Sequence, residues 1–438
     1  MLREIAHWFI DKDRLGSKFY VLLQLFLLCY LFTIALNNRF QFTTNLITFA
    51  ITAFFMMVIY PYNRRKPLVQ AKREIRFLCW LVIIPTFLLS VFSLLTFLFQ
   101  WSIVIDGYQM GFIENRLWGW CNPNTGSVVS MAAMLLGLVL LLCYSLTKRQ
   151  RVFLYGNMFI QLSYIILSDS RGTMVSFLFL IFVLTALLLG HRMRKGGSLF
   201  SVARQKKLAI LLFVPLLCVG ATVGITRLSK AGYSYLPAVV ALVGNAFTQE
   251  ETMPMLPGET PKPATDIAVA PVEIGRDEPV RSQEARLVLW QYLYERILER
   301  PLFGMSYARV NYDIVHRFTW HNTHNVYFQL LVGNGLAGLG IMLIIAIYYL
   351  ASMLRYFTKY RDDDKAYLIN LLLFAFMLSL FVNGLFEARL VIGLSFRNAF
   401  FWFILSYQMY FVSHYEWKHG IVSFSERVAT AARMVWLR

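Results

Sequence analysis

The stretch that decides the fold is residues 326–350, VYFQLLVGNGLAGLGIMLIIAIYYL, in which no side chain carries a charge. A run of ~20 apolar residues is long enough to cross the hydrocarbon core of a bilayer as a helix. His324 and Asn325 stand directly before this run, where a polar loop meets it. The pattern predicts a transmembrane helix with a titratable imidazole at its mouth, which is a candidate for chemistry.

Similar apolar runs recur along the chain. The protein has 438 residues, of which 58% are hydrophobic and 16% aromatic, and its mean hydropathy is +0.55. Soluble domains contain ~45–50% apolar residues, so we predict an all-α, polytopic transmembrane helix bundle of 10–12 spans. The ten clearest spans are 19–37, 44–60, 78–100, 129–147, 152–168, 173–190, 208–225, 326–350, 366–386 and 391–413. Two further segments, 101–121 and 233–247, are apolar enough to dip into the membrane.

The spans divide the chain into four predicted regions. Residues 1–225 hold spans one to seven, 226–325 form a catalytic loop on the outer face, 326–413 hold the C-terminal spans, and 414–438 form a cytoplasmic tail. The first span follows a polar segment without a small-residue cleavage site, so we expect an anchor and not a cleaved signal peptide.

Charge sets the predicted orientation. With the N-terminus inside, the inner segments hold 27 Lys+Arg and 9 Asp+Glu, whereas the rest of the chain holds 15 of each. The whole net charge of +18 thus falls on one side, as the positive-inside rule requires. Topology explains the basic charge, and nucleic-acid binding is not implied.

The outer loop is predicted to have two parts. Residues 250–282 are rich in proline and acids and should be irregular. An amphipathic helix is expected at about 282–299, with Ser282 as its cap and Pro301 as its stop. Its apolar face would carry Leu287, Trp290, Leu293, Ile297 and Leu298.

Four arginines share the outer face in this topology: Arg171, Arg286, Arg389 and Arg397. Guanidinium groups make bidentate, charge-assisted bonds to phosphate, so such a cluster suits a diphosphate. The alternative is that an arginine at a span end is a snorkelling anchor or a salt-bridge partner, and this is favoured for Arg397. Glu387 could pair with Arg389 or with another arginine of the cluster.

His324 is the candidate general base, because imidazole titrates near neutral pH and can take a proton from a sugar hydroxyl. Thr323 or Asn325 could cap the following helix and leave the ring free. His321 lies three residues earlier, but no carboxylate cluster accompanies the two histidines, so a metal site is disfavoured. The five cysteines suggest no disulfide framework or metal site, and we expect no cofactor. Gly335 and Gly338 would let helices pack closely.

Four motifs together resemble the bacterial O-antigen ligase and O-antigen polymerase family of membrane glycosyltransferases. They are Ser170-Arg171-Gly172, Arg286-x-x-x-Trp290 followed by Arg300-Pro-Leu-Phe-Gly304, His324-Asn325 with Gly335 and Gly338, and Glu387-Ala-Arg389. The resemblance covers roughly residues 165–415. The family usually has about twelve spans of ~20 residues, more than the ten clear ones counted here.

The resemblance implies a glycan donor on undecaprenyl diphosphate, an acceptor that is lipid-anchored or itself a glycan, and neither metal nor nucleotide sugar. Arg171, Arg286 and Arg389 would bind the diphosphate, His324 and Arg286 would be catalytic, and Asn325, Trp290, His321, Gly335 and Gly338 would support them. The expected location is the bacterial inner membrane, with membrane lipid as a partner and the site on the periplasmic face. A ligase acting in lipopolysaccharide biosynthesis is favoured over a polymerase, and a transporter of lipid-linked glycan is the distant alternative.

Overall fold

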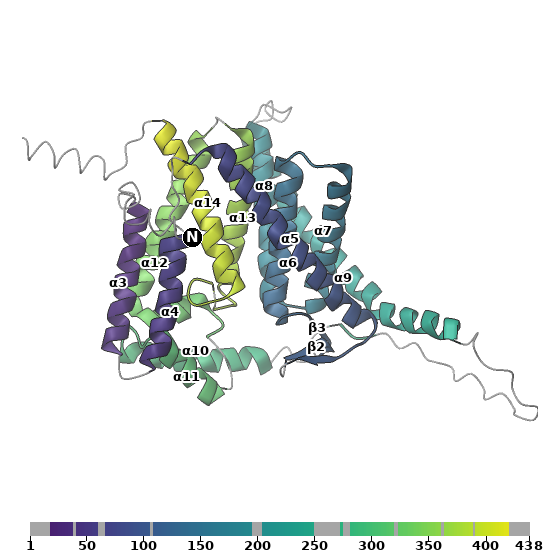
Figure 1. The fold of residues 1–438 in the computed structure, drawn as a ribbon, viewed down its shortest axis with the longest axis horizontal. Coiled ribbons are helices and arrows are strands. Elements are labelled where there is room, and N and C mark those ends of the chain that lie inside the picture. The colour runs from purple at the N-terminus through teal and green to yellow at the C-terminus, as the bar shows by residue number, and fades with distance from the viewer. Residues whose placement is uncertain are drawn as a thin grey trace, which may run out of the picture. The chain divides into compact units, whose positions relative to one another are not determined.

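The computed structural model describes residues 18–37, 41–59, 66–105, 108–194, 204–248, 272–274, 281–318, 323–360, 363–388 and 390–419. Within them lie twelve α-helices, and eight helices are long and apolar enough to cross a membrane. The predicted class, an all-α polytopic helix bundle, is therefore confirmed (Figure 1). The chain is a multi-pass membrane protein.

The eight candidate spans agree with eight of the ten predicted runs. They are Phe19–Leu36, Phe42–Ile59, Leu68–Leu98, Pro123–Cys143, Arg171–Met193, Ala209–Leu242, Val326–Lys359 and Asp364–Asn383. The other two predicted runs are also helical, in α7 (Lys148–Ser168) and α14 (Phe396–Lys418). These two helices are long enough to span, but their polar residues keep them outside the set defined by length and apolarity.

The segment 101–121 adds no helical span to the ten. This segment forms a three-stranded antiparallel sheet of β1 (Ile103–Ile105), β2 (Tyr108–Ile113) and β3 (Arg116–Trp118). Ile113 pairs with Arg116 across Glu114 and Asn115, whose φ values are 52° and 57°. Positive φ at both central residues is typical of a tight hairpin turn that matches the strand twist. In this segment the strand-like alternation of side chains and the tight turn determine the structure, although the overall composition is apolar.

The second doubtful segment, 233–247, makes no separate span. It continues α9 (Arg204–Thr248), a helix of 45 residues that runs well past the predicted loop boundary at 225. At 1.5 Å per residue such a helix is ~68 Å long, more than twice the ~30 Å thickness of a bilayer core. The predicted irregular loop at 250–282 lies outside the described residues, apart from 272–274 and 281–282.

The chain divides into two compact units. The first contains residues 1–78, 142–144 and 280–438, and the second contains 79–141 and 145–279. In the first unit α12 (Val326–Lys359) packs on α3 (Lys18–Leu36), and α13 (Asp364–Asn383) packs on α14, as Figure 1 shows. Polar side chains tie the buried helices together: the hydroxyl of Tyr349 donates to Oε1 of Gln408 over 2.7 Å.

The first unit also contains a helix broken to receive another segment. Gly335 has φ 68° and ψ −169° inside α12, so the regular hydrogen bonding stops there. The segment 301–305 fills the gap: Leu336 N donates to Pro301 O (2.8 Å), Ala337 N to Leu302 O (3.0 Å) and Met305 N to Val332 O (2.8 Å). Non-helical backbone is tolerated at membrane depth when protein groups satisfy it. The glycines predicted to serve helix packing therefore include one that opens a helix.

Neighbouring helices hold the inserted segment and the residues that follow it. Thr33 of α3 donates its hydroxyl to Phe303 O over 2.8 Å. Asn45 of α4 (Phe42–Phe54) donates to the Ser306 hydroxyl over 3.1 Å and accepts from Ala308 N over 3.0 Å. The motif Arg300-Pro-Leu-Phe-Gly304 thus has a structural role, because it closes the gap in α12.

The second unit is built on α5 (Leu68–Leu98) from residue 79 onward, the sheet, α6 (Pro123–Cys143), α7, α8 (Arg171–Arg194) and α9. Its hydrophobic core contains Phe97, Leu117, Tyr164 and Leu167, all at most 1% exposed. The sheet therefore packs on the ends of α5 and α7, and it contributes Arg116, whose side chain is buried, to the turn between α7 and α8.

Candidate functional site

His324 lies in a strained turn at the start of α12. Its φ is 51°, in the left-handed region that residues other than glycine rarely adopt. Such outliers persist only where the surroundings hold them, and they cluster at functional sites. His324 as a whole residue is half-buried, and its ring Nδ1 is buried.

Asn325, not His324, caps the helix. Its side-chain Oδ1 accepts hydrogen bonds from Tyr327 N (2.9 Å) and Phe328 N (3.1 Å), two of the backbone donors that a helix start leaves without partners. The Thr323 hydroxyl donates to Asn325 O over 2.8 Å and stiffens the turn. The prediction that a neighbour would cap α12 in place of His324 is confirmed.

The turn between α13 and α14 holds the start of α12. Val326 N donates to Gly384 O (2.8 Å), and Asn325 Nδ2 donates to Leu385 O (3.2 Å). Tyr327 adds a bond from its hydroxyl to Phe381 O (3.0 Å). A Cβ on Gly384 would lie 2.7 Å from a methyl carbon of Val326, so this close approach requires glycine. Three bonds from consecutive residues thus fix the His324 turn on the last two helices.

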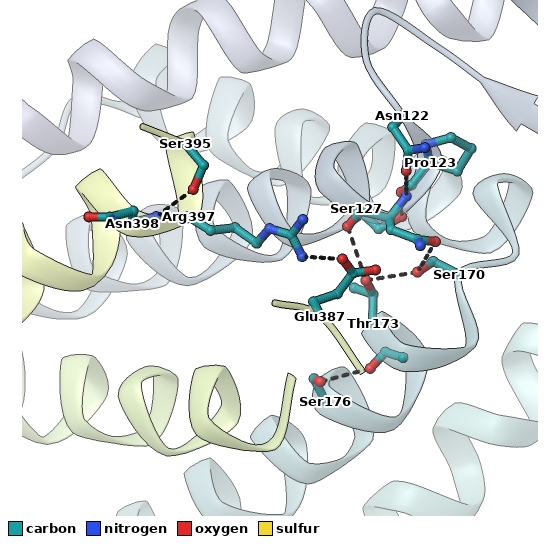
Figure 2. A network of polar contacts seen from close by, with 12 residues as sticks. Asn122, Pro123, Ser127, Ser170, Thr173, Ser176, Glu387, Ser395, Arg397 and Asn398 are labelled. Carbon is teal, nitrogen blue, oxygen red and sulfur yellow. Dashed lines mark hydrogen bonds and ion pairs between the residues drawn. The ribbon is translucent and has the colours of Figure 1, made fainter. Parts of the chain in front are cut away.

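The same turn leads to a buried ion pair. Nη1 of Arg397, in the first turn of α14, lies 3.0 Å from Oε2 of Glu387, and the two side chains are 6% and 9% exposed. Figure 2 shows the Arg397 guanidinium pointing at Glu387, with the Ser395 hydroxyl capping α14 at Asn398 N. The favoured reading of Arg397 as a salt-bridge partner is correct, and Glu387 pairs with it. Arg389 lies outside the described residues.

The amphipathic helix α10 (Arg281–Glu299) reaches the His324 turn through Trp290. The indole Nε1 donates to Thr323 O over 3.2 Å, and the ring stacks on Phe328 with centroids 5.5 Å apart. Arg286 stands four residues before Trp290, and such residues share a helix face with Cβ atoms ~5–6 Å apart. The side chain of Arg286 is outside the described part, as is the whole of His321. The backbone nonetheless brings Arg286 to the neighbourhood of His324.

The predicted bounds of α10 are right, but its predicted apolar face is only partly right. Leu287 and Leu298 are 63% and 62% exposed, whereas Leu289, Tyr292, Leu293 and Ile297 are buried. The core of this region joins them to helix α11 (Tyr307–Phe318) and to Val332 of α12. The buried face of α10 follows the helical repeat of ~3.6 residues through Leu289, Leu293 and Ile297. Which residues lie at the middle of this face depends on the positions of α11 and α12.

Arg171 belongs to the second unit and starts α8. The preceding residue, Ser170, donates its hydroxyl to Asn124 Oδ1 and to the Thr173 hydroxyl, each over 3.0 Å, as Figure 2 shows for Ser170 and Thr173. The Arg171 side chain is exposed. In the part of the chain that the structure describes, it makes no hydrogen bond or ion pair. A polar network thus fixes the backbone of Arg171, and its guanidinium remains available.

Two residues around Arg171, Arg116 and Lys230, were not singled out by sequence reasoning. Arg116 of β3 donates from Nε to Ser168 O over 3.0 Å, and Lys230 of α9 forms an ion pair with Asp169. The signal that could have found Lys230 is its position: together with Arg227 it interrupts the apolar stretch Ala209–Leu242, and a charge in such a stretch is a functional candidate by default. Arg116 gave no comparable signal, because its burial depends on the sheet.

Among the described residues, no three His, Cys, Asp or Glu side chains gather as metal ligands. The fold and the site define a polytopic membrane protein. In its first unit, the turn that carries His324 lies against the amphipathic helix α10. Residues 156–344 match the family model described as O-antigen ligase, and this match confirms the resemblance to the O-antigen ligase and polymerase family. Three of the four motifs fall inside the matched stretch, and Glu387-Ala-Arg389 lies beyond it. No curated protein matches the chain.

Proposed function

We propose that this protein is a glycosyltransferase that moves a glycan from undecaprenyl diphosphate to an acceptor sugar on the periplasmic face of the bacterial inner membrane. The family match supports an enzyme of the O-antigen ligase or polymerase type that acts on lipid-linked glycans. The single observation that carries the proposal is the contact of Trp290 with Thr323, which joins the Arg286 helix to the His324 turn. A candidate base and a candidate diphosphate ligand thereby lie in one region.

The proposed reaction is a direct displacement at the anomeric carbon. His324 accepts the proton of the acceptor hydroxyl, the hydroxyl oxygen forms the new bond to the anomeric carbon, and the bond from that carbon to the diphosphate oxygen breaks. Undecaprenyl diphosphate leaves with the electron pair. Arg286 and Arg171 stabilise its growing negative charge, and Arg389 adds to the binding of the diphosphate. Diphosphate is a good leaving group, so this charge stabilisation serves where other enzymes use a cation.

The rest of the site keeps the base in place. Asn325 satisfies the start of α12, so that His324 does not have to serve as a cap. Two hydrogen bonds hold the left-handed backbone conformation of His324. The Thr323 hydroxyl donates to Asn325 O, and the Asn325 side chain donates to Leu385 O. Preorganisation of this kind removes the cost of ordering the base during the reaction.

Purified protein in liposomes with a lipid-linked glycan donor and a lipid-anchored acceptor tests the proposal. His324→Asn and Arg286→Ala should abolish formation of the glycosidic bond. Asparagine tolerates the left-handed conformation, so His324→Asn removes the imidazole and keeps the turn. Arg296→Ala is the matched control on α10, because its pair with Glu299 is exposed and such pairs contribute little. Full activity of either site variant contradicts the assigned roles.

We favour a ligase over a polymerase because one loop carries both Arg286 and His324, and a polymerase is the alternative. The size of the product separates them. A ligase joins one glycan to each lipid-anchored core, whereas a polymerase given only donor makes a lengthening ladder. Bond formation in detergent, without a second compartment, excludes a transporter of lipid-linked glycan.

A further inference from the structure

Asp169 is held beside Arg171 by the turn between α7 and α8. Asp169 ends α7 with φ 44° and ψ 40°, and its N–H donates to Ile166 O. Arg171 begins α8 two residues later, with Ser170 between them. A carboxylate is therefore fixed next to an arginine that, in the proposed function, must bind diphosphate. An unpaired Asp169 would be an internal competitor for that guanidinium.

Lys230 of α9 removes this competitor by forming an ion pair with Asp169 Oδ1. The side chains of Lys230 and Asp169 are 26% and 18% exposed, so the pair is partly shielded from solvent. One turn further along α9, the Tyr233 hydroxyl lies 2.6 Å from the Ser163 hydroxyl of α7. Residues three apart share a helix face. The two contacts therefore dock one face of α9 on the end of α7 and bring Lys230 to Asp169.

Lys230 is placed where its charge has a direct partner. The lysine lies in the apolar stretch Ala209–Leu242 of α9, and its ion pair with Asp169 neutralises its charge there. The first turn of α8 carries no acidic residue, and the N-terminus of a helix has a positive partial charge. With Asp169 committed to Lys230, the start of α8 presents Arg171 and the helix dipole, a positive field that favours an anion.

We infer that Lys230 is a positioning residue, which neutralises Asp169 and so keeps the Arg171 guanidinium available to the donor diphosphate. This inference rests on the proposed function. It assigns to Lys230 and Asp169 a role through Arg171, without contact between either residue and the substrate. The two residues act together. Asp169 ends α7 in the left-handed conformation of the turn, and Lys230 neutralises the negative charge of the Asp169 carboxylate.

The test is a series of variants assayed for kcat/KM with the lipid-linked donor in liposomes. Lys230→Met leaves Asp169 free to bind Arg171 and should lower kcat/KM about tenfold, a factor that corresponds to ~1.4 kcal/mol. Lys230→Arg keeps the pair and should retain activity. The double variant Asp169→Asn with Lys230→Met has no free carboxylate, so it should recover to within about twofold of the parent. Arg149→Met, which removes an exposed positive charge at the other end of α7, should change nothing.

The recovery separates charge neutralisation from a merely structural role. If the double variant is as impaired as Lys230→Met, the ion pair only supports the fold and the inference is overturned. Thermal unfolding in detergent verifies that each variant is folded, and Lys230→Arg provides a folded reference with the pair intact. The variant Arg171→Ala tests the role of Arg171 in the proposed function separately from the role of Lys230. Full activity of Arg171→Ala would exclude Arg171 from the proposed function and would also overturn the inference about Lys230. An inactive Arg171→Ala without recovery in the double variant refutes the Lys230 role alone.

Discussion

The indole of Trp290 donates a hydrogen bond to the carbonyl oxygen of Thr323 over 3.2 Å, and its ring stacks on Phe328. Through this one side chain, the amphipathic helix α10 is attached to the turn that carries His324. The contact joins residues 33 apart in the sequence. Arg286 lies one turn before Trp290 on the same helix, so the geometry of the proposed site depends on this attachment.

Trp290→Phe should separate the hydrogen bond from the stack. Phenylalanine keeps an aromatic ring against Phe328 but has no N–H for Thr323. A typical hydrogen bond contributes ~1 kcal/mol, so kcat/KM should fall about fivefold with little change in Tm. Trp290→Ala also removes the packing and should cost ~3–5 kcal/mol of stability. Transfer assays and thermal unfolding in detergent measure the two effects, and equal activity of Trp290→Phe and the parent would contradict this role for the indole.

Gly335→Ala should be severely destabilising. The glycine has φ 68°, and an added Cβ would lie 2.3 Å from the carbonyl carbon and oxygen of Leu302. Both atoms are backbone, so the inserted segment 301–305 would have to move and lose its bonds to α12. A strained backbone position costs ~1–3 kcal/mol before the clash is counted, and a lowered Tm should accompany lost activity.

Gly340→Ala is the matched control for the break in α12. It lies on the same helix five positions further, and nothing is within 4 Å of an added Cβ. Alanine is favoured over glycine inside a helix by ~1 kcal/mol, so Tm should stay level or rise. Similar losses of stability in Gly335→Ala and Gly340→Ala would show that the broken helix is not the cause.

Separation of the buried pair of Glu387 and Arg397 should unfold the region around the α13–α14 turn. Removing one partner leaves a buried charge uncompensated, which costs ~3–5 kcal/mol. Glu387→Gln and Arg397→Met should each lower Tm strongly. The double variant Glu387→Gln with Arg397→Met leaves no buried charge and should be more stable than either single variant. A double variant at least as unstable as the sum of the two would disprove the pairing.

Acid should weaken the tie between α5 and α13 that Lys72 and Asp363 form. Burial opposes the ionisation of Asp363, but the Lys72 ammonium and the backbone N–H groups of Ala366 and Lys365 outweigh it, so the pKa of Asp363 is lowered. A carboxyl whose pKa is lowered by folding adds stability above its ordinary value of ~3.9. That stability is lost as the pH falls through the lowered pKa.

Asp363→Asn isolates this contribution. Asparagine is as good a helix cap as aspartate, so the bond to Ala366 N survives and only the charge disappears. The difference in Tm between parent and variant should be largest near neutral pH and should shrink as the pH drops below about 4. Tm measured from pH 3 to pH 7 gives the answer, and a difference that grows toward low pH would contradict the sign of the shift.

Prediction from the sequence succeeded for features that depend on local composition. The helix α10 appears within one residue of its expected bounds, and the cap of α12 is one of the two expected residues. It did not foresee the sheet at 101–121, where apolarity allowed a further span and the chain instead forms strands joined by a hairpin turn at Glu114 and Asn115. Bulk hydropathy does not register the positive φ that two adjacent turn residues adopt.

For the candidate site, too, the sequence predicted some features and missed others. Residue type and position singled out His324, Arg286 and Arg171 from the sequence, but the ion pairs in the segments around them join residues that the sequence did not link. Lys230 reaches Asp169 across 61 residues, and the pairing of Glu387 with Arg397 was one of several open alternatives. The role of Gly335 also changed, since close helix packing and a broken helix share the same glycine-rich pattern.

By itself, the sequence determined that this chain is a bundle of membrane helices with its basic charge on one predicted side, because both properties follow from the composition of short segments in a bilayer. Only the tertiary structure decided which charges neutralise one another and which helix opens to admit another segment. The tertiary structure also decided that Trp290 attaches α10 to the His324 turn. These choices are contacts between residues far apart in the chain, and the same local pattern is compatible with several of them until packing selects one.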